Sequence, residues 1–358
     1  MLSALDPSSA LRLLLPSLAV WQAAGVVYWA CLVEVKFVDT VGQAKETASM
    51  IRRSCVLFML VSLLLLGCQQ ESHNQKQLPT RVSGPFNASR AFSHLVAQVN
   101  FGPRVPGTEA HRRCLDYIIH HLSSAAKSLQ TQQFPIDCYD EPIKGTNILA
   151  TFGNGAGEPI FYCCHWDTRP IANKDPNPDN RYKPIPGAND GASGVAVLLE
   201  LATLFHEKPP PRDVSLVFLD AEDSGDYREC EFCIGSYYLA RNLDSVFSER
   251  PSFGVLIDMI GDRDLSIPKE RYSVALAPDV VNSVWAIARR LGCSQFKDEI
   301  GPSVFDDHIW FNRAGVPTID IIDFDYPVWH TLQDNVDHCS KESLKAVGDV
   351  LYALASEK

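Results

Sequence analysis

The sequence predicts an α/β protein, built as a single domain with a central twisted, mostly parallel mixed sheet that is flanked by helices. Short apolar segments without polar alternation, typical of buried parallel strands, recur along the chain. Amphipathic segments of helical period separate them. From Phe86 onward there is no internal repeat and no long Gly/Ser-rich or Pro-rich linker, which indicates one domain over residues 86–358.

Hydrophobic periodicity places the elements in order along the chain. The predicted strands are Asn147–Phe152, Ile160–Cys164, Val214–Leu219, Gly254–Ile257 and Pro317–Ile322. The predicted helices are Arg90–Val99, Thr108–Leu122, a helix from about Asp190 to Phe205, Ile234–Arg241, Asp279–Leu291 and Lys341–Ala355, and a further helix opens at Asp306. The glycine-rich stretch after Phe152 predicts a hairpin between the first two strands. Arg169–Gly187 is expected to be a long loop of the kind that often covers a site.

The N-terminal part has a different character from the rest of the chain. Residues 13–33 carry no charge and are long enough to span a bilayer. A second pattern starts with Arg52 and Arg53, continues through the apolar run 56–66 and ends at Cys68. This pattern resembles a bacterial lipoprotein signal with its lipobox, which implies cleavage before Cys68 and a lipid on its sulfur.

These patterns divide the N-terminal part into three predicted pieces. Residues 50–67 are the signal peptide, residues 68–85 are a polar tether, and residues 1–49 are an upstream over-extension of the reading frame ahead of Met50. A membrane segment, as a two-span anchor or a re-entrant apolar hairpin, is the alternative. The lipoprotein interpretation predicts a lipid-anchored protein of the bacterial cell envelope, facing the periplasm or the surface, and a membrane anchor would also leave the domain outside the cytoplasm.

The net charge and the cysteine content indicate which binding partners and which cellular compartment to expect. The formal net charge of −11 argues against nucleic acid, because phosphate binding requires a basic surface. An oxidising envelope permits disulfides among the cysteines of the domain. Cys230 and Cys233 have the spacing of half a zinc site, but no second pair matches, so a local disulfide or free thiols are expected. Cys163 and Cys164 end an apolar run and are expected to be buried thiols.

Acidic and imidazole side chains recur where predicted strands end or helices begin. They are His165, Asp167, Asp190, Glu222, Asp223, Asp258 and His330. In open α/β sheets ligands bind at the carboxyl edge of the strands, so these side chains are expected to converge there. Zinc accepts imidazole and carboxylate ligands and keeps one position open in a catalytic site. Asp190, Asp223 and His330 are therefore predicted as its ligands, which leaves Glu222 free for general acid–base catalysis.

Each of these residues also has a purely structural interpretation. Asp190 could cap the helix that it opens. Glu222 and Asp223 could form a solvated turn, and Trp329, next to His330, could belong to the core. Because several such segments are expected at one edge of one sheet, a functional site is the better interpretation.

Three motifs resemble those of the zinc-dependent aminopeptidases, peptidase family M28: Cys164–Asp167, Gly187–Gly194 and Phe218–Asp223. Asp306–Ile309 and Val328–Thr331 more narrowly resemble the glutaminyl cyclase branch of that family, in its bacterial type. The resemblance covers residues 86–358, and it is specific because the motifs occur together. It implies a zinc exopeptidase-like fold.

The resemblance also implies which residues hold the metal and move protons. One zinc per chain is held by Asp190, Asp223 and His330, although the animal cyclases usually have Glu in place of Asp223. Glu222 corresponds to the proton shuttle of the family. The implied activity is that of a glutaminyl-peptide cyclotransferase, which converts the N-terminal glutamine of a peptide or protein to pyroglutamate and releases ammonia.

Three further residues correspond to parts of the cyclase site. Asp258 and Asp306 match a hydrogen-bonded acid pair beside the shuttle, and Trp329 matches the aromatic wall against which the substrate side chain packs. Aminopeptidases of the family typically carry Ser where this chain has Asp306, and they lack Trp329. These two residues therefore favour the cyclase over the main alternative, a two-zinc aminopeptidase.

The aminopeptidase alternative needs a second metal. His165 and Asp258 would bind it, Asp190 would bridge the two zincs, and Glu222 would activate water. All of these positions hold usable residues, so the ligand inventory leaves this alternative open, with His165 and Asp167 as candidates for second-metal or supporting positions. A third interpretation is an inactive surface lipoprotein that binds peptides; it predicts a broken site, and the sequence shows no break.

Overall fold

The computed structural model of the protein describes residues 84–139 and 141–357. The predicted leader, the signal peptide with Cys68 and nearly all of the predicted tether lie outside this part of the chain. Among the described residues, no helix is both long enough and apolar enough to cross a membrane.

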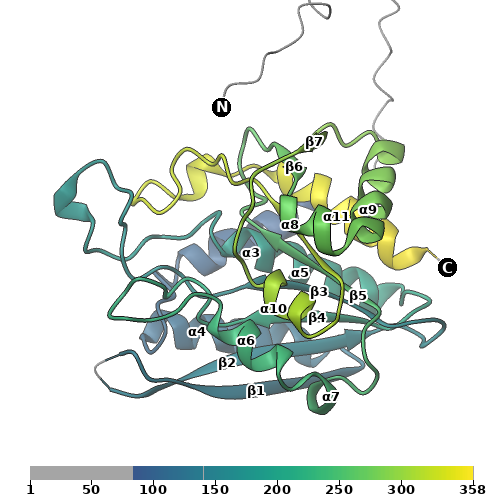
Figure 1. Ribbon diagram of the computed structural model, residues 1–358, viewed down its shortest axis with the longest axis horizontal. Helices are drawn as coiled ribbons and strands as arrows, with labels where there is room; N and C mark the ends of the chain where they lie inside the picture. Colours follow the sequence, from purple (N-terminus) through teal and green to yellow (C-terminus); the bar gives the residue numbers. More distant parts are fainter. Residues whose placement is uncertain (1–83, 140, 358) are drawn as a thin grey trace, which may run out of the picture. The chain divides into compact units, whose positions relative to one another are not determined.

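A six-stranded mixed sheet forms the centre of the domain (Figure 1). Its strand order is β1 (Ser128–Ile136), β2 (Ile143–Phe152), β4 (Val214–Leu219), β3 (Ile160–His165), β5 (Phe253–Asp258) and β8 (Thr318–Ile322). The last four of these strands run parallel, whereas β1 and β2 form an antiparallel edge. The predicted fold class, a mostly parallel mixed sheet flanked by helices, is confirmed.

The parallel strands are buried because both faces of the sheet are covered. Every residue of β3 and β4 is buried, as expected for the uninterrupted apolar segments that predicted them. Their register aligns the carboxyl ends of the strands. His165 is opposite Leu219 across β3 and β4, and Asp258 is opposite Ile322 across β5 and β8. One edge of the sheet thus collects the segments that follow these strands.

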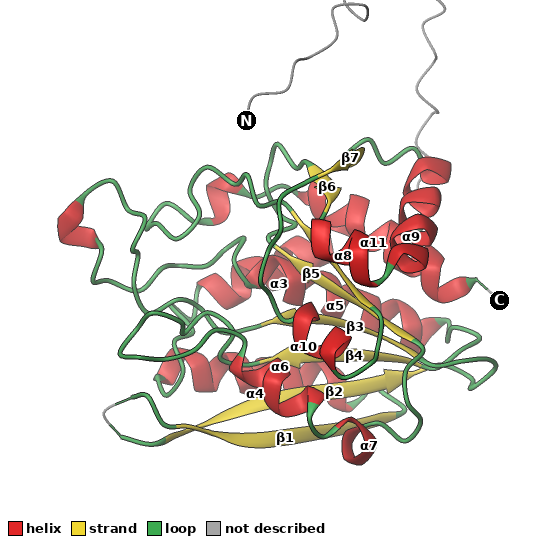
Figure 2. Cartoon of the chain, viewed as in Figure 1, coloured by secondary structure: helices red, strands yellow, loops and turns green. Residues whose placement is uncertain are grey.

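Helices cover both faces of the sheet (Figure 2). Alternate residues of a strand point to opposite faces, so Tyr162 of β3 belongs to one core and Phe161 to the other. The larger core contains residues of α3 (Ala88–Val99), α4 (Glu109–Ser123), α5 (Ala192–Glu207), α9 (Pro278–Leu291) and α11 (Lys341–Ser356). The smaller core contains residues of α6 (Ile234–Ala240), α7 (Leu243–Val246) and α10 (His308–Arg313).

Local sequence signals explain where several helices begin and how the central one packs. The side chains of Asn87, Thr108 and Ser340 accept hydrogen bonds from first-turn amides of α3, α4 and α11. Helix α5 is buried over most of its length, and Gly194 lets it approach the sheet. A Cβ atom at Gly194 would lie 2.7 Å from Cβ of Cys164 in β3, so a larger residue would push the helix away.

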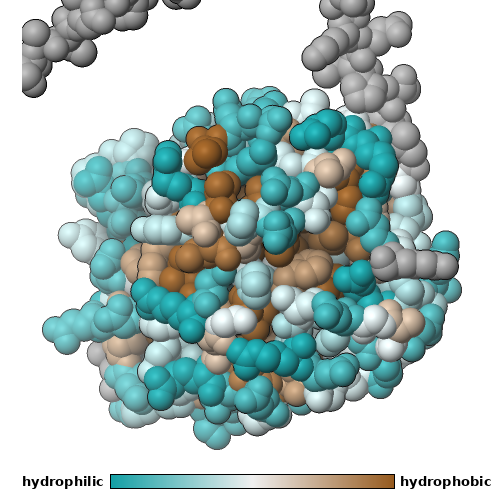
Figure 3. All heavy atoms as spheres, turned by 45° about the vertical axis from the view of Figure 1, so that its right-hand side comes forward, coloured by the Kyte–Doolittle hydropathy of each residue, from teal (hydrophilic) through white to brown (hydrophobic). Residues whose placement is uncertain are grey.

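A small parallel pair, β6 (Ile267–Lys269) and β7 (Phe296–Ile300), and helix α8 (Arg271–Leu276) complete the described elements near β8. The face shown in Figure 3 is largely hydrophilic, with apolar groups toward its middle. Exposed large apolar side chains include Leu276, Ile300 and Phe305.

The predicted hairpin between the first two predicted strands is wrong. Strand β4 lies between β2 and β3, antiparallel to β2 and parallel to β3. The glycine-rich loop instead bonds to the segment before β4, through the amides of Asn154 and Ala156 and the carbonyls of Pro210 and Pro211. Turn residues indicate a chain reversal, but they do not specify which strand becomes the neighbour.

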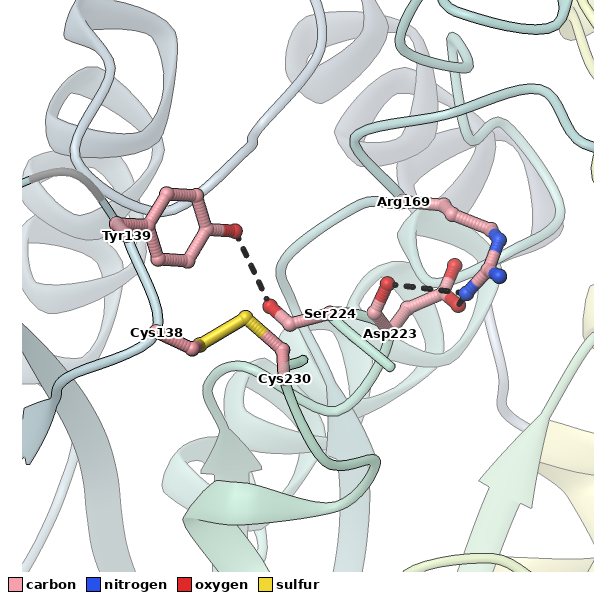
Figure 4. Close-up of a disulfide and its surroundings, with 6 residues drawn as sticks. All are labelled: Cys138, Tyr139, Arg169, Asp223, Ser224 and Cys230. Atoms are coloured by element: carbon pink, nitrogen blue, oxygen red, sulfur yellow. Dashed lines mark hydrogen bonds and ion pairs between the residues drawn. A yellow bond between two sulfur atoms is a disulfide. The ribbon is translucent and has the colours of Figure 1, made fainter. Parts of the chain in front are cut away.

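The cysteines also differ from the prediction at one place. Cys230 forms a disulfide with Cys138, 92 residues earlier, rather than with Cys233 (Figure 4). This bond excludes a zinc half-site at Cys230 and Cys233, and it ties the β1–β2 turn to the segment between β4 and α6. Cys233 is a buried free thiol, and so are Cys163 and Cys164, as predicted.

Candidate active site

The segments that follow the parallel strands meet at the carboxyl edge of the sheet. They carry His165 at the end of β3, Glu222 and Asp223 after β4, Asp258 at the end of β5, His330 after β8, and Asp190 before α5. Together with Cys233 and Asp306, these side chains form three groups, two of which share Asp190. Within each group the potential metal-binding atoms lie within 4.8 Å of one another. Distant parts of the chain are therefore brought together by the alignment of the strand ends.

The first group consists of Asp190, Asp223 and His330, which are at most 5% exposed. His330 Nε2 lies 3.4 Å from Asp223 Oδ1 and 3.6 Å from Asp190 Oδ2. Asp190 Oδ2 and Asp223 Oδ2 are buried without a hydrogen-bond partner. Buried carboxylate oxygens are unfavourable unless a cation or a donor satisfies them. Two carboxylates and one imidazole, with unsatisfied acceptors between them, form a donor set that fits zinc.

The backbone of Asp190 is held by a hydrogen bond to Asp334, and the side chain of Asp190 does not cap helix α5. The residue before α5 is Gly191, and no side chain caps this helix. Asp334 accepts hydrogen bonds from the amides of Asn189 and Asp190, at 2.8 and 3.2 Å, and from the hydroxyl of Tyr326 at 2.8 Å. The interpretation of Asp190 as a helix cap is therefore wrong, and its carboxylate is available to the site.

The second group consists of His165, Asp190 and Asp258. His165 Nε2 lies 3.1 Å from Asp190 Oδ1 and 3.1 Å from Asp258 Oδ1. Burial by itself would lower the pKa of His165, but its contacts with Asp167, Asp190 and Asp258 outweigh burial and raise this pKa well above its ordinary value. The residues that a second metal would need thus also lie together, with Asp190 shared between the two groups.

The third group consists of Glu222, Cys233 and Asp306. The Cys233 thiol donates to Glu222 Oε1 over 3.5 Å, and the Glu222 side chain is 14% exposed, so part of it is open to solvent. Burial, and then the charge of Asp223, raises the pKa of Glu222 well above its usual range. Burial, and then the charge of Asp258, raises the pKa of Asp306 to about 7. Carboxyl groups with raised pKa values can give and take protons near neutral pH.

Asp258 was expected to share a hydrogen bond with Asp306. In the structure Asp258 Oδ1 lies 3.1 Å from His165 Nε2 and accepts the amide of Met259 at 2.8 Å. The two acids interact through charge, since the charge of Asp258 contributes, after burial, to the raised pKa of Asp306. Their direct hydrogen bond stays a prediction.

Several supporting residues surround these groups. The side chain of Asp167 accepts hydrogen bonds of 3.1 Å from the backbone amides of Glu222 and Asp223. It therefore holds the backbone of these two acids in place. Arg169 donates a hydrogen bond of 2.9 Å to Asp223 Oδ1 (Figure 4). Sequence reasoning missed Arg169 as a site residue, although its place two residues after Asp167 and at the start of a long loop was a usable signal.

Trp329 and the long loop 169–187 lie next to the first group. The Trp329 ring is 4.0 Å from that of His330 between centroids, and Trp329 is only partly buried, so it is not simply a core residue. The Lys174 ammonium lies 5.4 Å from the Trp329 ring, and the Lys174 amide donates to the carbonyl of His330. Asp175 accepts the amide of Leu332 at 3.0 Å. The loop thus runs along the segment that carries Trp329 and His330.

Comparison with known proteins shows the family to which the chain belongs. Residues 147–355 match the sequence profile of Peptidase family M28. The chain belongs to peptidase family M28. Its structure is similar to that of a Bacteroides thetaiotaomicron glutaminyl cyclase, with 38% identity, 77% of this chain and 100% of that chain covered, and a TM-score of 0.73. A Zn-dependent exopeptidase from Parabacteroides distasonis is 33% identical over 77% of this chain and 100% of that chain, with a TM-score of 0.73.

The relatives of this chain also include an enzyme that is named for a different activity. Aminopeptidase YwaD of Bacillus subtilis is 26% identical over 208 residues, which are 55% of this chain but only 40% of that protein. The chain thus spans less than half the length of this relative. The protein is an enzyme of the zinc-dependent M28 superfamily, and zinc, the metal used by its relatives, fits the donor set of the first group.

Proposed function

We propose that the protein is a zinc-dependent glutaminyl-peptide cyclotransferase, which converts the N-terminal glutamine of peptides or proteins to pyroglutamate and releases ammonia. The observation that carries the proposal is the acid Asp306 in one group with Glu222, at a position where the family's aminopeptidases typically have Ser. The likeness to a bacterial glutaminyl cyclase at 38% identity over the full length of that chain supports it.

In this proposal Asp190, Asp223 and His330 hold one zinc. Zinc, when bound, supplies Lewis-acid polarisation of the side-chain amide of the substrate glutamine. The substrate's own α-amine is the nucleophile, so the residues around it must hold the chain folded back on itself. Trp329 packs against the glutamine side chain and keeps the amine close to the amide carbon, and such positioning supplies much of the acceleration in an intramolecular reaction.

Glu222 moves the proton that the reaction transfers. Its carboxylate accepts a proton from the α-amine as the bond between that nitrogen and the side-chain carbonyl carbon forms. The same group then delivers the proton to the side-chain nitrogen as its bond to carbon breaks, so that ammonia leaves and no water is consumed. Asp258 and Asp306 share a proton and hold the amine and the departing nitrogen.

Two substrates and a zinc count test the proposal. The purified protein is incubated with a Gln-initiated dipeptide amide and with a Leu-initiated chromogenic amide, and zinc is measured by elemental analysis. We expect ammonia release from the first, no cleavage of the second, and about one zinc per chain. Cleavage of the second substrate with about two zincs would instead identify an aminopeptidase.

A two-zinc aminopeptidase is the second candidate, because His165, Asp190 and Asp258 also form a potential metal site. Glu222 would then activate water rather than the substrate amine. The variant Asp306→Ser separates the two functions. A cyclase loses ammonia release, by about 10²-fold or more, because the acid that holds the amine is gone. An aminopeptidase keeps its peptidase activity, because Ser is the usual residue at this position in that group.

We further propose that the protein is lipid-anchored in a bacterial cell envelope. The pattern from Met50 to Cys68 supports this proposal, and so does the disulfide between Cys138 and Cys230, since such bonds persist in oxidising compartments. Cells expressing the protein are labelled with a fatty acid and fractionated. The protein should carry the label and sediment with membranes, whereas Cys68→Ser should do neither; a labelled Cys68→Ser variant would contradict the assignment.

A further inference from the structure

A buried guanidinium lies next to one of the proposed zinc ligands. The side chain of Arg169 is 1% exposed and that of Asp223 is 2% exposed. Arg169 Nη1 donates a hydrogen bond of 2.9 Å to Asp223 Oδ1 and another of 3.4 Å to the backbone carbonyl of Asp223 (Figure 4). Arg169 has no step in the proposed reaction, so its role lies in what it does to Asp223.

The guanidinium is itself held from more than one side. Its Nε donates a hydrogen bond of 2.8 Å to the side chain of Asn173, and its Cζ atom lies over the ring of Phe232, 5.2 Å from the ring centroid. Phe232 in turn occupies the space beside Gly225, where a Cβ atom would lie 2.0 Å from the ring. The planar group of Arg169 therefore holds Nη1 on Asp223 and Nε on Asn173 in one fixed orientation, which the flexible single ammonium of a Lys cannot reproduce.

The two oxygens of Asp223 have different surroundings. Oδ1, which Arg169 binds, is also the oxygen that lies 3.4 Å from His330 Nε2, and Oδ2 is buried without a hydrogen-bond partner. The backbone of Asp223 is held separately, because Asp167 accepts its amide. The carboxylate can still rotate about its side-chain bonds. The hydrogen bond from Arg169 to Oδ1 fixes this rotation.

We propose that Arg169 is a positioning residue that holds the Asp223 carboxylate toward Asp190 and His330 and thereby sets the affinity and geometry of the zinc site. This proposal rests on the ligand set proposed above, and it applies equally to a cyclase and to an aminopeptidase. Replacement of a residue that hydrogen-bonds to a metal ligand typically changes metal affinity by about 10- to 100-fold. A guanidinium also repels a dication, so the test must separate its charge from its geometry.

Two variants of Arg169 make that separation. Arg169→Lys keeps the charge and loses the planar group that contacts Asp223 and Asn173 together, and Arg169→Met loses both the charge and the planar group. The zinc dissociation constant is measured by competition with a chromophoric chelator, and the site geometry is followed in the visible spectrum of the Co²⁺-substituted protein. We expect both variants to bind zinc about 10- to 100-fold more weakly and to show an altered Co²⁺ spectrum. Unchanged affinity in Arg169→Lys, or tighter zinc in Arg169→Met, would overturn the proposal.

A matched control is Arg90→Lys, which changes a different arginine–carboxylate contact, with Glu200 in α5. It should leave zinc affinity unchanged. If the Arg169 variants do not fold, Asn173→Ala keeps Arg169 and frees its Nε; a smaller loss of zinc affinity supports the role of Arg169, and wild-type affinity refutes it. Asp223→Asn tests the ligand set separately: if it keeps wild-type zinc affinity, the proposed ligand set is wrong, whatever Arg169 does.

Discussion

Two groups of side chains at the carboxyl edge of the sheet share Asp190. They differ in the hydrogen-bond partners of their carboxylate oxygens. In the group of Asp190, Asp223 and His330, one oxygen of each carboxylate is buried without a hydrogen-bond partner. In the group of His165, Asp190 and Asp258, the imidazole Nε2 lies 3.1 Å from an oxygen of each carboxylate. The first group has acceptors that a cation would satisfy, whereas the second supplies its own donor.

The supports of the two groups differ as well. In the first, Arg169 holds the carboxylate of Asp223 and Asp334 holds the amide of Asp190, so loops set its geometry. In the second, His165 and Asp258 are the last residues of β3 and β5, neighbouring strands of the sheet. The comparison favours a single zinc at the first group, and the number of zincs is what separates the proposed cyclase from a two-zinc aminopeptidase.

The largest expected effect comes from removing the imidazole of each group in turn. His330→Ala should reduce bound zinc from about one per chain to almost none and abolish ammonia release, because a ligand is lost. His165→Asn should keep about one zinc per chain. Elemental analysis after dialysis against a weak chelator measures both. If His165→Asn removes one of two zincs, the second group is a metal site and the comparison is wrong.

The next effect concerns the proton shuttle that lies beside both groups. Glu222→Gln should lower turnover of a Gln-initiated dipeptide by about 10²-fold or more, because an amide cannot accept the proton of the α-amine. Zinc content should not change, since Glu222 is not in the first group. A steady-state assay paired with metal analysis checks both statements. Undiminished turnover would remove Glu222 from the mechanism.

A third prediction concerns the disulfide that anchors the segment after Asp223. Replacing both Cys138 and Cys230 with Ser should lower the free energy of unfolding by about 2–4 kcal/mol, because the unfolded chain loses a long cross-link. Zinc affinity should change little, since Arg169 and Asp167 still hold Asp223. Urea unfolding with zinc present measures the first effect. Reduced wild-type protein should behave like the double variant; a large loss of zinc affinity in either would show that the disulfide positions the first group.

The smallest expected effect is at the aromatic wall. Trp329→Leu should lower kcat/KM for a Gln-initiated dipeptide by about 2- to 10-fold, the equivalent of 0.5–1.5 kcal/mol of lost aromatic packing. Zinc content should stay at the wild-type value because Trp329 is not a ligand in the proposal. Initial-rate measurements at low substrate concentration check the change. A variant with full activity would show that the substrate side chain packs elsewhere.

Much of the secondary structure could be predicted because buried parallel strands and amphipathic helices have strong local patterns. The strand Val214–Leu219 has the predicted bounds, and the helix over Asp279–Leu291 begins one residue earlier than predicted. Strand β1 was not predicted. It lies at the edge of the sheet, carries several Gln residues and is half exposed, so its sequence SLQTQQFPI lacks the apolar run of a central strand.

The residues of the candidate site could be found because each follows a strand or precedes a helix. Their division into groups could not be found in this way, since it depends on where side chains point in space. The disulfide partner of Cys230 lies 92 residues away, and Arg169 reaches Asp223 across 54 residues. Contacts over such distances leave no periodic signal in the sequence.

By itself, the sequence determined the class of fold, the order of the main elements and the set of acids and imidazoles at the edge of the sheet. Only the tertiary structure decided that β4 separates β2 from β3, that Asp190 is shared by two groups, and that Arg169 braces Asp223. The reason is physical. Local backbone preference and the alternation of apolar residues act over a few residues, whereas strand neighbours and buried polar contacts are set by the packing of the whole domain.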